Sequence, residues 1–159
     1  MAAPQRIEYV SFSHSSLTLM CGSKAIDCYD WAGLFEVGAS RGSNRAIPGV
    51  AGSSVRPHIR GELTAELHFR CRGAFSDNNV VQPVSTHRAN VLARIEEVRA
   101  FLDLAPGRQL SLTLATSSGS ATEPVTFLAM GSVAFKSPEI AEFRVLVAVP
   151  SGLFPIPAV

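Results

Sequence analysis

Apolar residues recur at helical spacing in one long segment, residues 85–104, which reads STHRANVLARIEEVRAFLDL. One stripe of this segment holds its apolar side chains: Val91, Leu92, Ile95, Val98, Phe101 and Leu102. The charged side chains fall on the opposite side. Ser85 or Thr86 can accept a hydrogen bond from a free N–H of the first turn, and Pro106-Gly107 ends the segment. The pattern predicts one amphipathic helix over about residues 86–104.

Much of the remaining chain alternates apolar and polar residues with period two, which is typical of strands with one buried face. The clearest strand is predicted over residues 61–72, where Leu63, Ala65, Leu67, Phe69 and Cys71 alternate with polar side chains. A hairpin or two short strands are predicted over residues 6–19. Further strands are predicted over residues 34–37, 109–116, 126–130, 132–136 and 142–149, with a bend or bulge at Gly131 and a turn at SSGSAT. The last strand is apolar on both faces, so we expect it at the centre of a sandwich or against another chain.

These elements predict an α+β fold that is mainly β. We expect a β-sandwich or split barrel of antiparallel strands, with the helix laid against the sheet or across the mouth of the barrel. The 159 residues fit one domain, expected over residues 1–149. Residues 150–159, PSGLFPIPAV, contain three prolines and cannot pair freely in a sheet. We expect this tail to be fixed on a neighbouring chain or across its own domain.

Residues 38–60, GASRGSNRAIPGVAGSSVRPHIR, are rich in Gly, Ser, Pro and Arg and lack periodicity. They predict a long, constrained loop. Structureless loops longer than roughly 15 residues are uncommon inside compact domains and are usually functional or ordered by a neighbour. No aromatic residues interleave with its arginines, as stacking on single-stranded nucleic acid would require. We therefore expect the loop to clasp an adjacent subunit, its arginines pairing with carboxylates such as Glu62 or Glu66 of the same or the next chain.

The composition favours subunit contacts without requiring them. Hydrophobic residues make up 47% of the chain and charged residues 17%, below the roughly 25% usual for globular domains. A small β protein with Ser, Thr and Gly outside would show the same values. The net charge of +1 gives no reason to expect a polyanionic partner at long range. No segment approaches the ~18 apolar residues of a membrane helix, and no signal-peptide core is present, so we expect a protein used without secretion or membrane binding.

The sequence contains no strong motif for catalysis or metal binding. GASRG at residues 38–42 matches the GxSxG nucleophile elbow, but that turn requires a helix to follow at once, and SNRAIPG follows instead. A small serine hydrolase using Ser40 is therefore only a remote alternative. The histidines and cysteines show no metal-ligand spacing, and His68 and Cys71 should point to opposite faces of their strand. We expect free thiols, no catalytic residues, no metal and no cofactor.

The order of the segments carries a resemblance. Residues 41–52, RGSNRAIPGVAG, resemble the RGxNRxIPGxxG segment of tail proteins from long-tailed, non-contractile bacteriophages. LFEV precedes this segment, and the GELTAELHFRCRG strand, a helix ending in LDLAPG, a β segment and the closing VLVAVPSGLFPIP follow it. The closing stretch is similar to the strand-then-PDPFW ending of that group. In this chain Ser151-Gly152 and Ile156-Pro157 replace the aspartate and tryptophan of the group's motif. From about residue 34 to residue 157, the chain resembles the distal tail protein, or minor tail protein, family.

The resemblance implies a tail-tube-like ring domain in the virion, assembled in the host bacterial cytoplasm. Its partners would be further copies of the chain in a hexameric ring, the tail tube protein and the baseplate hub, with genomic DNA only in transit. Tail tube and tail terminator subunits share this fold and remain alternatives. We expect subunit contacts at Arg41, Asn44, Arg45, Ile47, Pro48, Gly49, Leu153, Phe154 and Pro155. The polar face of the strand at 61–72 is the predicted lumen lining: Glu62, Thr64, Glu66, His68 and Arg70.

Overall fold

The computed structural model describes residues 9–38, 40–41, 45–46, 53–54 and 59–157. One helix, α1 (His87–Leu104), lies between short 3₁₀ turns, η1 (Val84–Thr86) and η2 (Pro106–Arg108). The eight strands of the main sheet are β1 (Tyr9–His14), β2 (Leu17–Cys21), β3 (Ile26–Ala32), β8 (Leu63–Arg72), β9 (Gln109–Thr116), β10 (Gly119–Met130), β11 (Ala134–Ser137) and β12 (Ile140–Val149). Four two-residue strands complete the list: β4 (Ser40–Arg41), β5 (Arg45–Ala46), β6 (Ser53–Ser54) and β7 (Ile59–Arg60).

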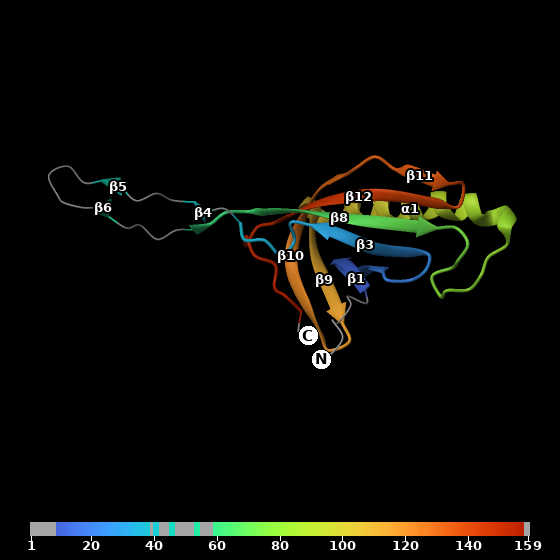
Figure 1. Ribbon diagram of the computed structural model, residues 1–159, viewed down its shortest axis with the longest axis horizontal. Helices are drawn as coiled ribbons and strands as arrows, with labels where there is room; N and C mark the ends of the chain where they lie inside the picture. The colour runs from blue at the N-terminus through green and yellow to red at the C-terminus, as the bar shows by residue number, and fades with distance from the viewer. Residues whose placement is uncertain (1–8, 39, 42–44, 47–52, 55–58, 158–159) are drawn as a thin grey trace.

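The main sheet is antiparallel throughout and has the order β2-β1-β9-β10-β12-β8-β3, with β11 also paired to β12. The sheet curls over its own core (Figure 1). Phe12 of β1 and Phe69 of β8 belong to distant strands of the sheet, yet their ring centroids are 6.0 Å apart. A bridge between Gly22 and Asp27 also links the end of β2 to β3. The predicted mainly-β antiparallel fold with one helix is confirmed.

Strand β8 shows why the period-two prediction succeeds. Its inward residues, Leu63, Ala65, Leu67, Phe69 and Cys71, are all buried, while the residues between them are partly or fully exposed. Strand β12 lies between β10 and β8, and Val145, Val147 and Ala148 are buried. The central position predicted for this strand is therefore confirmed.

Helix α1 buries Val91, Val98 and Leu102 in the core, as its apolar stripe predicts. Leu92, assigned to the same stripe, is 50% exposed, so the buried face is narrower than predicted. Thr86 occupies the N-cap position but makes no side-chain cap, because its hydroxyl donates to the Pro83 carbonyl oxygen at 2.8 Å. The helix ends before Pro106-Gly107, where Gly107 has a φ of 62°.

Three strand predictions need correction. Residues 34–37 form a turn that begins at Gly33, whose φ is 76°, and only Val37 bridges another segment. Strand β3 was not predicted, because its sequence IDCYDWA mixes polar and apolar residues. The predicted turn at SSGSAT is shorter than expected, since β10 begins at Gly119.

The predicted bend around Gly131 is present. Strands β10 and β11 lie one after the other along the same edge of β12, and the register shifts between Phe127 and Ala129. The Gly131 N–H donates to the carbonyl oxygen of Arg144 at 2.7 Å, which holds the connection against β12.

The segment predicted to be a long, constrained loop without periodicity contains paired strands. Strand β4 pairs with β7, and β5 pairs with β6, both antiparallel. These pairs form an arm that leads away from the main sheet (Figure 1). Ser40 lies in β4 and the next described element is β5, so the helix required by a nucleophile elbow does not follow it.

Candidate assembly surface

The root of the arm is a junction of three buried glycines, Gly38, Gly61 and Gly152. The Gly38 N–H donates to the Gly152 carbonyl oxygen at 2.7 Å. A Cβ atom on Gly38 or on Gly152 would collide with the Gly61 carbonyl oxygen. Only side-chain-free residues allow the two ends of the arm and the C-terminal tail to meet this closely. The arm is therefore fixed to the domain through backbone contacts.

The C-terminal tail is fixed across its own domain, one of the two arrangements expected for it. Phe154 is 1% exposed, and its ring lies 6.3 Å from that of Phe35, which is in turn 6.2 Å from Trp31. Leu153 bridges Val37 and stays 39% exposed, and Pro155 is also exposed. Phe154, predicted at a subunit interface, packs in its own core here, so it offers no surface to a neighbour in this arrangement.

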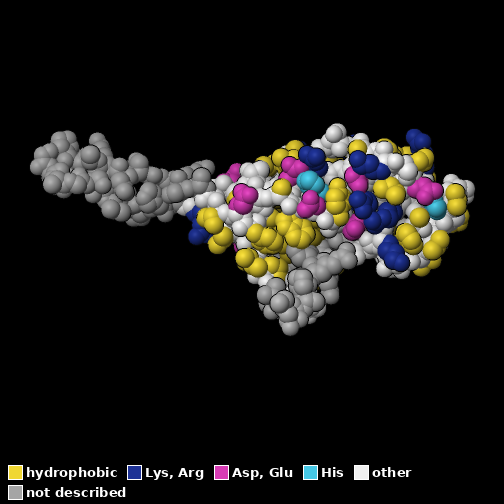
Figure 2. Space-filling view, in the orientation of Figure 1, with side chains coloured by type: hydrophobic (Ala, Val, Ile, Leu, Met, Phe, Trp, Pro, Cys, Tyr) yellow, Lys and Arg dark blue, Asp and Glu magenta, His cyan; other side chains and the backbone are white. Residues whose placement is uncertain are grey.

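Exposed apolar side chains gather beside the root of the arm. Phe35, Val37 and Leu153 are 36%, 65% and 39% exposed, and we call them the arm-root patch. Figure 2 shows hydrophobic side chains concentrated on the part of this face nearest the arm. Contiguous exposed apolar groups are typical of contact surfaces. Of the other predicted interface residues, Arg41 and Arg45 lie in β4 and β5, whereas Asn44, Ile47, Pro48 and Gly49 lie outside the described residues.

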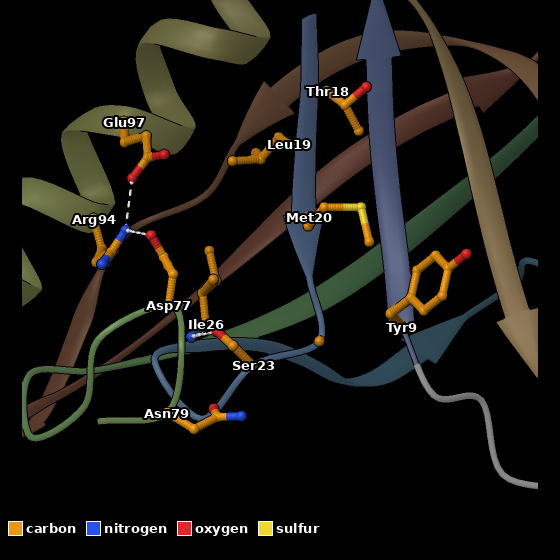
Figure 3. A pocket seen from close by; sticks show the side chains of 11 residues that line it. Tyr9, Thr18, Leu19, Met20, Ser23, Ile26, Asp77, Asn79, Arg94 and Glu97 are labelled. Atoms are coloured by element: carbon orange, nitrogen blue, oxygen red, sulfur yellow. Dashed lines mark hydrogen bonds and ion pairs between the residues drawn. The ribbon is translucent and has the colours of Figure 1, made fainter. Parts of the chain in front are cut away.

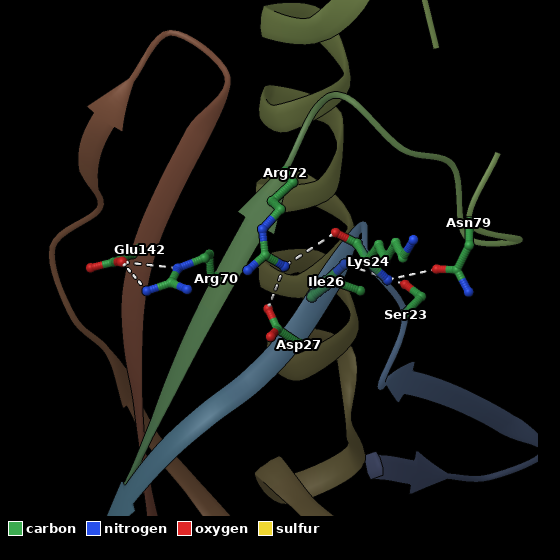
Figure 4. Close-up of polar contacts among 8 residues, drawn as sticks. All are labelled: Ser23, Lys24, Ile26, Asp27, Arg70, Arg72, Asn79 and Glu142. Carbon is green, nitrogen blue, oxygen red and sulfur yellow. Dashed lines mark hydrogen bonds and ion pairs between the residues drawn. The ribbon is translucent and has the colours of Figure 1, made fainter. Parts of the chain in front are cut away.

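The outer face of β3, β8 and β12 carries a ladder of ion pairs. Arg70 donates to Glu142 Oε1 from Nε at 3.0 Å and from Nη2 at 2.8 Å, and Arg72 pairs with Asp27 at 3.3 Å (Figure 4). The hydrogen bonds from Arg70 lower the pKa of the Glu142 carboxyl group. The Arg70 guanidinium also lies 4.6 Å from the centre of the Tyr29 ring.

Glu66 completes this ladder by contacting His68 and Arg144. It approaches His68 Nε2 at 2.9 Å and Arg144 Nη1 at 3.1 Å. Thr64 is exposed, and Glu62, on the same parity, is also exposed just before the strand. The five residues predicted to line a lumen therefore share one accessible face, but their position in an assembly stays a prediction.

A cavity of about 490 Å³ lies between β2, α1 and residues 77–79 (Figure 3). Arg94 forms one wall and pairs with Asp77 at 2.6 Å and Glu97 at 3.1 Å. These contacts join the helix to the segment before it and leave no charge on Arg94 without a partner. Glu96 pairs with Arg99 on the outer face of the helix. The charged side of the helix is therefore laced with ion pairs.

The cysteines are poor candidates for nucleophiles or metal ligands. All three are free; Cys21 and Cys71 are buried, and Cys28 is partly buried. Burial raises the pKa of the Cys28 and Cys71 thiols to about 12 and raises that of Cys21 as well. Among the described residues, no three His, Cys, Asp or Glu side chains are grouped to hold a metal ion. The described part of the chain also has no helix long and apolar enough to cross a membrane.

The curled antiparallel sheet with one helix is a fold that also occurs in a solved phage protein. The crystal structure of SPP1 Dit (gp 19.1) matches this chain with a TM-score of 0.52 and 12% sequence identity. The match covers 90% of this chain and 50% of the SPP1 chain. SPP1 Dit is described as a paradigm of the hub adsorption apparatus in phages that infect Gram-positive bacteria. No protein-family model matches the sequence, and no curated protein matches it. The resemblance expected from the sequence is confirmed for the fold.

The sequence analysis identified some residues of this outer face and missed others. Period two placed Glu62, Glu66 and Arg70 on one face, because a single strand carries them. Tyr29, Asp27 and Asp30 were missed, because they lie on β3, and Glu36 was missed because it follows a turn. The charged residues in and around the stretch CYDW of this strand could have indicated that the strand carries part of the charged face.

Proposed function

We propose that this chain is a structural tail protein that assembles into a homomeric ring at the end of a phage tail, joining the tail tube to the baseplate hub. The observation that carries the proposal is the fold shared with SPP1 Dit over 90% of the chain. The ring would leave an open centre through which DNA passes during ejection. A closed ring is expected, because identical subunits joined head to tail by one repeated contact form rings. The resemblance to the distal tail family implies that the ring has six subunits.

The arm supports this assignment physically. A ring subunit must hold a neighbour through a segment that reaches beyond its own core, and the arm leads away from the sheet on a fixed root. The ion-paired face of β8 would suit a passage for DNA, because each described arginine of that strand already contacts a carboxylate. Free cationic side chains there would bind phosphates and retard the polymer.

The test is the mass of the purified protein by size exclusion with light scattering, followed by negative-stain imaging, alone and with the tail tube and hub proteins of the same phage. We expect closed rings with an open centre. A matched variant replaces residues 40–60 with a short Gly-Ser turn and should remain folded but monomeric. A wild-type chain that stays monomeric alone and with both partner proteins would refute the proposal.

A further inference from the structure

The loop between β8 and α1, residues 73–86, carries three strongly exposed apolar side chains. Val80, Val81 and Val84 are 57%, 73% and 76% exposed, and we call them the valine patch. Single exposed apolar residues are ordinary on a protein surface, but a group of them on one short loop is typical of a contact surface. The loop lies at the end of the domain opposite the arm (Figure 1).

This loop is fixed to the domain at several points. Phe75 bridges Val81, which gives the loop the form of a small hairpin. The Asn79 side chain accepts a hydrogen bond from the Lys24 N–H at 2.7 Å (Figure 4), and Asp77 forms an ion pair with α1. The valine side chains are thus presented on an anchored backbone, so little conformational entropy is lost when a partner covers them.

Two cations without a carboxylate partner flank the valine patch. Arg72 and Arg94 pair with carboxylates, so their charges are balanced. Lys24 and Arg88 are exposed, and within the described ranges neither forms an ion pair. The Lys24 ammonium group lies 5.1 Å from the centre of the Phe75 ring, at the base of the loop, and Arg88 is in the first turn of α1. A complementary partner surface would therefore be apolar, with carboxylates at its border.

The arm-root patch, at the other end of the domain, has this character. Glu36 lies between two of its members in the chain, and Glu62 follows the glycine junction to which Val37 and Leu153 are directly attached. Both glutamates are exposed and make no ion pair with any described residue, and Arg60 is the one described arginine beside them that likewise makes none. Figure 2 shows acidic side chains beside the hydrophobic ones on the part of the face nearest the arm.

We propose that the valine patch of one copy docks on the arm-root patch of the next copy, with Lys24 and Arg88 facing Glu36 and Glu62. This inference rests on the ring proposed above and names two surfaces of the domain that meet within it. A head-to-tail contact requires two different surfaces at separate places on each subunit, and these patches lie at opposite ends. Like ends carry like unpaired charges and repel, so the charges also direct the contact. Exposed charges are screened within about 8 Å at physiological salt, so this selection acts only on docking.

The first test removes the apolar contact. The variant V81S/V84S shortens two side chains while the backbone bridge of the loop remains. It should raise the concentration needed for half assembly by about tenfold or more, because the apolar area buried in the contact is lost. The control L92S/L104S shortens two exposed leucines of α1, which are 50% and 75% exposed, and should assemble like the wild type.

The second test exchanges charges between the two ends. K24E/R88E and E36K/E62K should each weaken assembly by about tenfold, because the facing charges become repulsive. Combining the four substitutions should restore assembly in large part.

Circular dichroism and thermal unfolding of each variant establish that it is folded, as expected for substitutions of exposed side chains. Equal assembly of V81S/V84S and its control overturns the inference, and so does failure of the four-substitution variant to recover. The ring proposal survives either result, because assembly of the wild-type chain tests it separately.

A third measurement detects the contact directly, using the protein's own amines. The chain has two lysines, Lys24 and Lys136. A water-soluble carbodiimide joins a lysine amine to a touching carboxylate as an amide, and the lost water converts the carbodiimide into a urea. Mixing isotopically labelled and unlabelled chains identifies links between copies by mass spectrometry.

We expect links from Lys24 of one copy to Glu36 or Glu62 of another. The control K24R keeps the charge but removes the amine, so it should assemble normally and lose these links. Assembled wild-type chains in which Lys24 reaches neither glutamate overturn the inference.

Discussion

Replacing Phe69 with alanine should test whether the curled sheet is held together through one aromatic contact. Phe69 is 1% exposed, its ring stacks on Phe143 of the neighbouring β12 at 5.6 Å, and it meets Phe12 of β1 across the core at 6.0 Å. A buried phenylalanine removes about 200 Å² from water, which at about 25 cal/mol per Å² corresponds to roughly 5 kcal/mol. Alanine retains part of this burial, but a cavity remains, so we expect a loss of about 4 kcal/mol.

The loss would be measured by urea unfolding followed by circular dichroism. With a slope near 2 kcal/mol per molar urea, the midpoint should fall by about 2 M while the slope stays unchanged. The melting temperature should fall by about 10 °C. The control is Phe135→Ala on β11, where the side chain is 46% exposed and the expected loss is below about 1 kcal/mol. Equal losses in the two variants, or a loss below about 1.5 kcal/mol at Phe69, would refute the reasoning.

Three further predictions concern the arm root, a buried histidine and a strained turn. Gly38→Ala should lower the free energy of unfolding by about 1 to 3 kcal/mol, measured by thermal unfolding, because the alanine Cβ would collide with the Gly61 carbonyl oxygen. Gly131→Ala should be tolerated, because a Cβ there has space. His87 contacts the Gln82 carbonyl oxygen and the Glu139 carboxylate, which raise its pKa above 6.5. The contribution of protonated His87 to the free energy of unfolding should be complete below pH 6.5 and should disappear as the pH rises through the folded-state pKa. His87→Asn should flatten this loss of stability with rising pH, measured by urea unfolding at a series of pH values. A stability profile unchanged by the substitution would contradict the prediction. Arg108 has a φ of 56°, so Arg108→Gly should be more stable to urea than Arg108→Ala by about 1 kcal/mol, and the reverse order would exclude strain there.

The sequence predicted the elements whose burial follows a simple period. Strand β8 alternates cleanly because one face meets the core, most of β9 and the first part of β12 follow the same period, and α1 shows its stripe for the same reason. Strand β3 was missed because it lies at the end of the strand order, where, among the described residues, only Asp27 is bridged on the side away from β8 and polar residues are tolerated. The β10 segment before Val125 was missed because it is short in apolar residues and contains Pro124.

The assembly surface could be predicted only where a single segment carries it. The unusual composition of residues 38–60 marked the arm, although periodicity could not show that β4 pairs with β7. The position of Asp30 beside His68 depends on the register of β3 against β8, and that of Glu36 depends on the turn at Gly33, neither of which local patterns encode. The burial of Phe154 likewise depends on a distant segment, the turn that carries Phe35.

The place of β12 in the sheet has a consequence for how the chain folds in time. This strand pairs with β10 on one side and β8 on the other, so it is the strand that joins β2-β1-β9-β10 to β8-β3; among the described residues, the single bridge between Gly22 and Asp27 is the other backbone pairing between these groups. It is also the last strand of the sheet to leave the ribosome. Until then the nascent chain holds two open part-sheets, each with a bare edge able to pair with another chain. The emergence of β12 is thus the step that commits a subunit to its own fold and makes it ready to meet its neighbours.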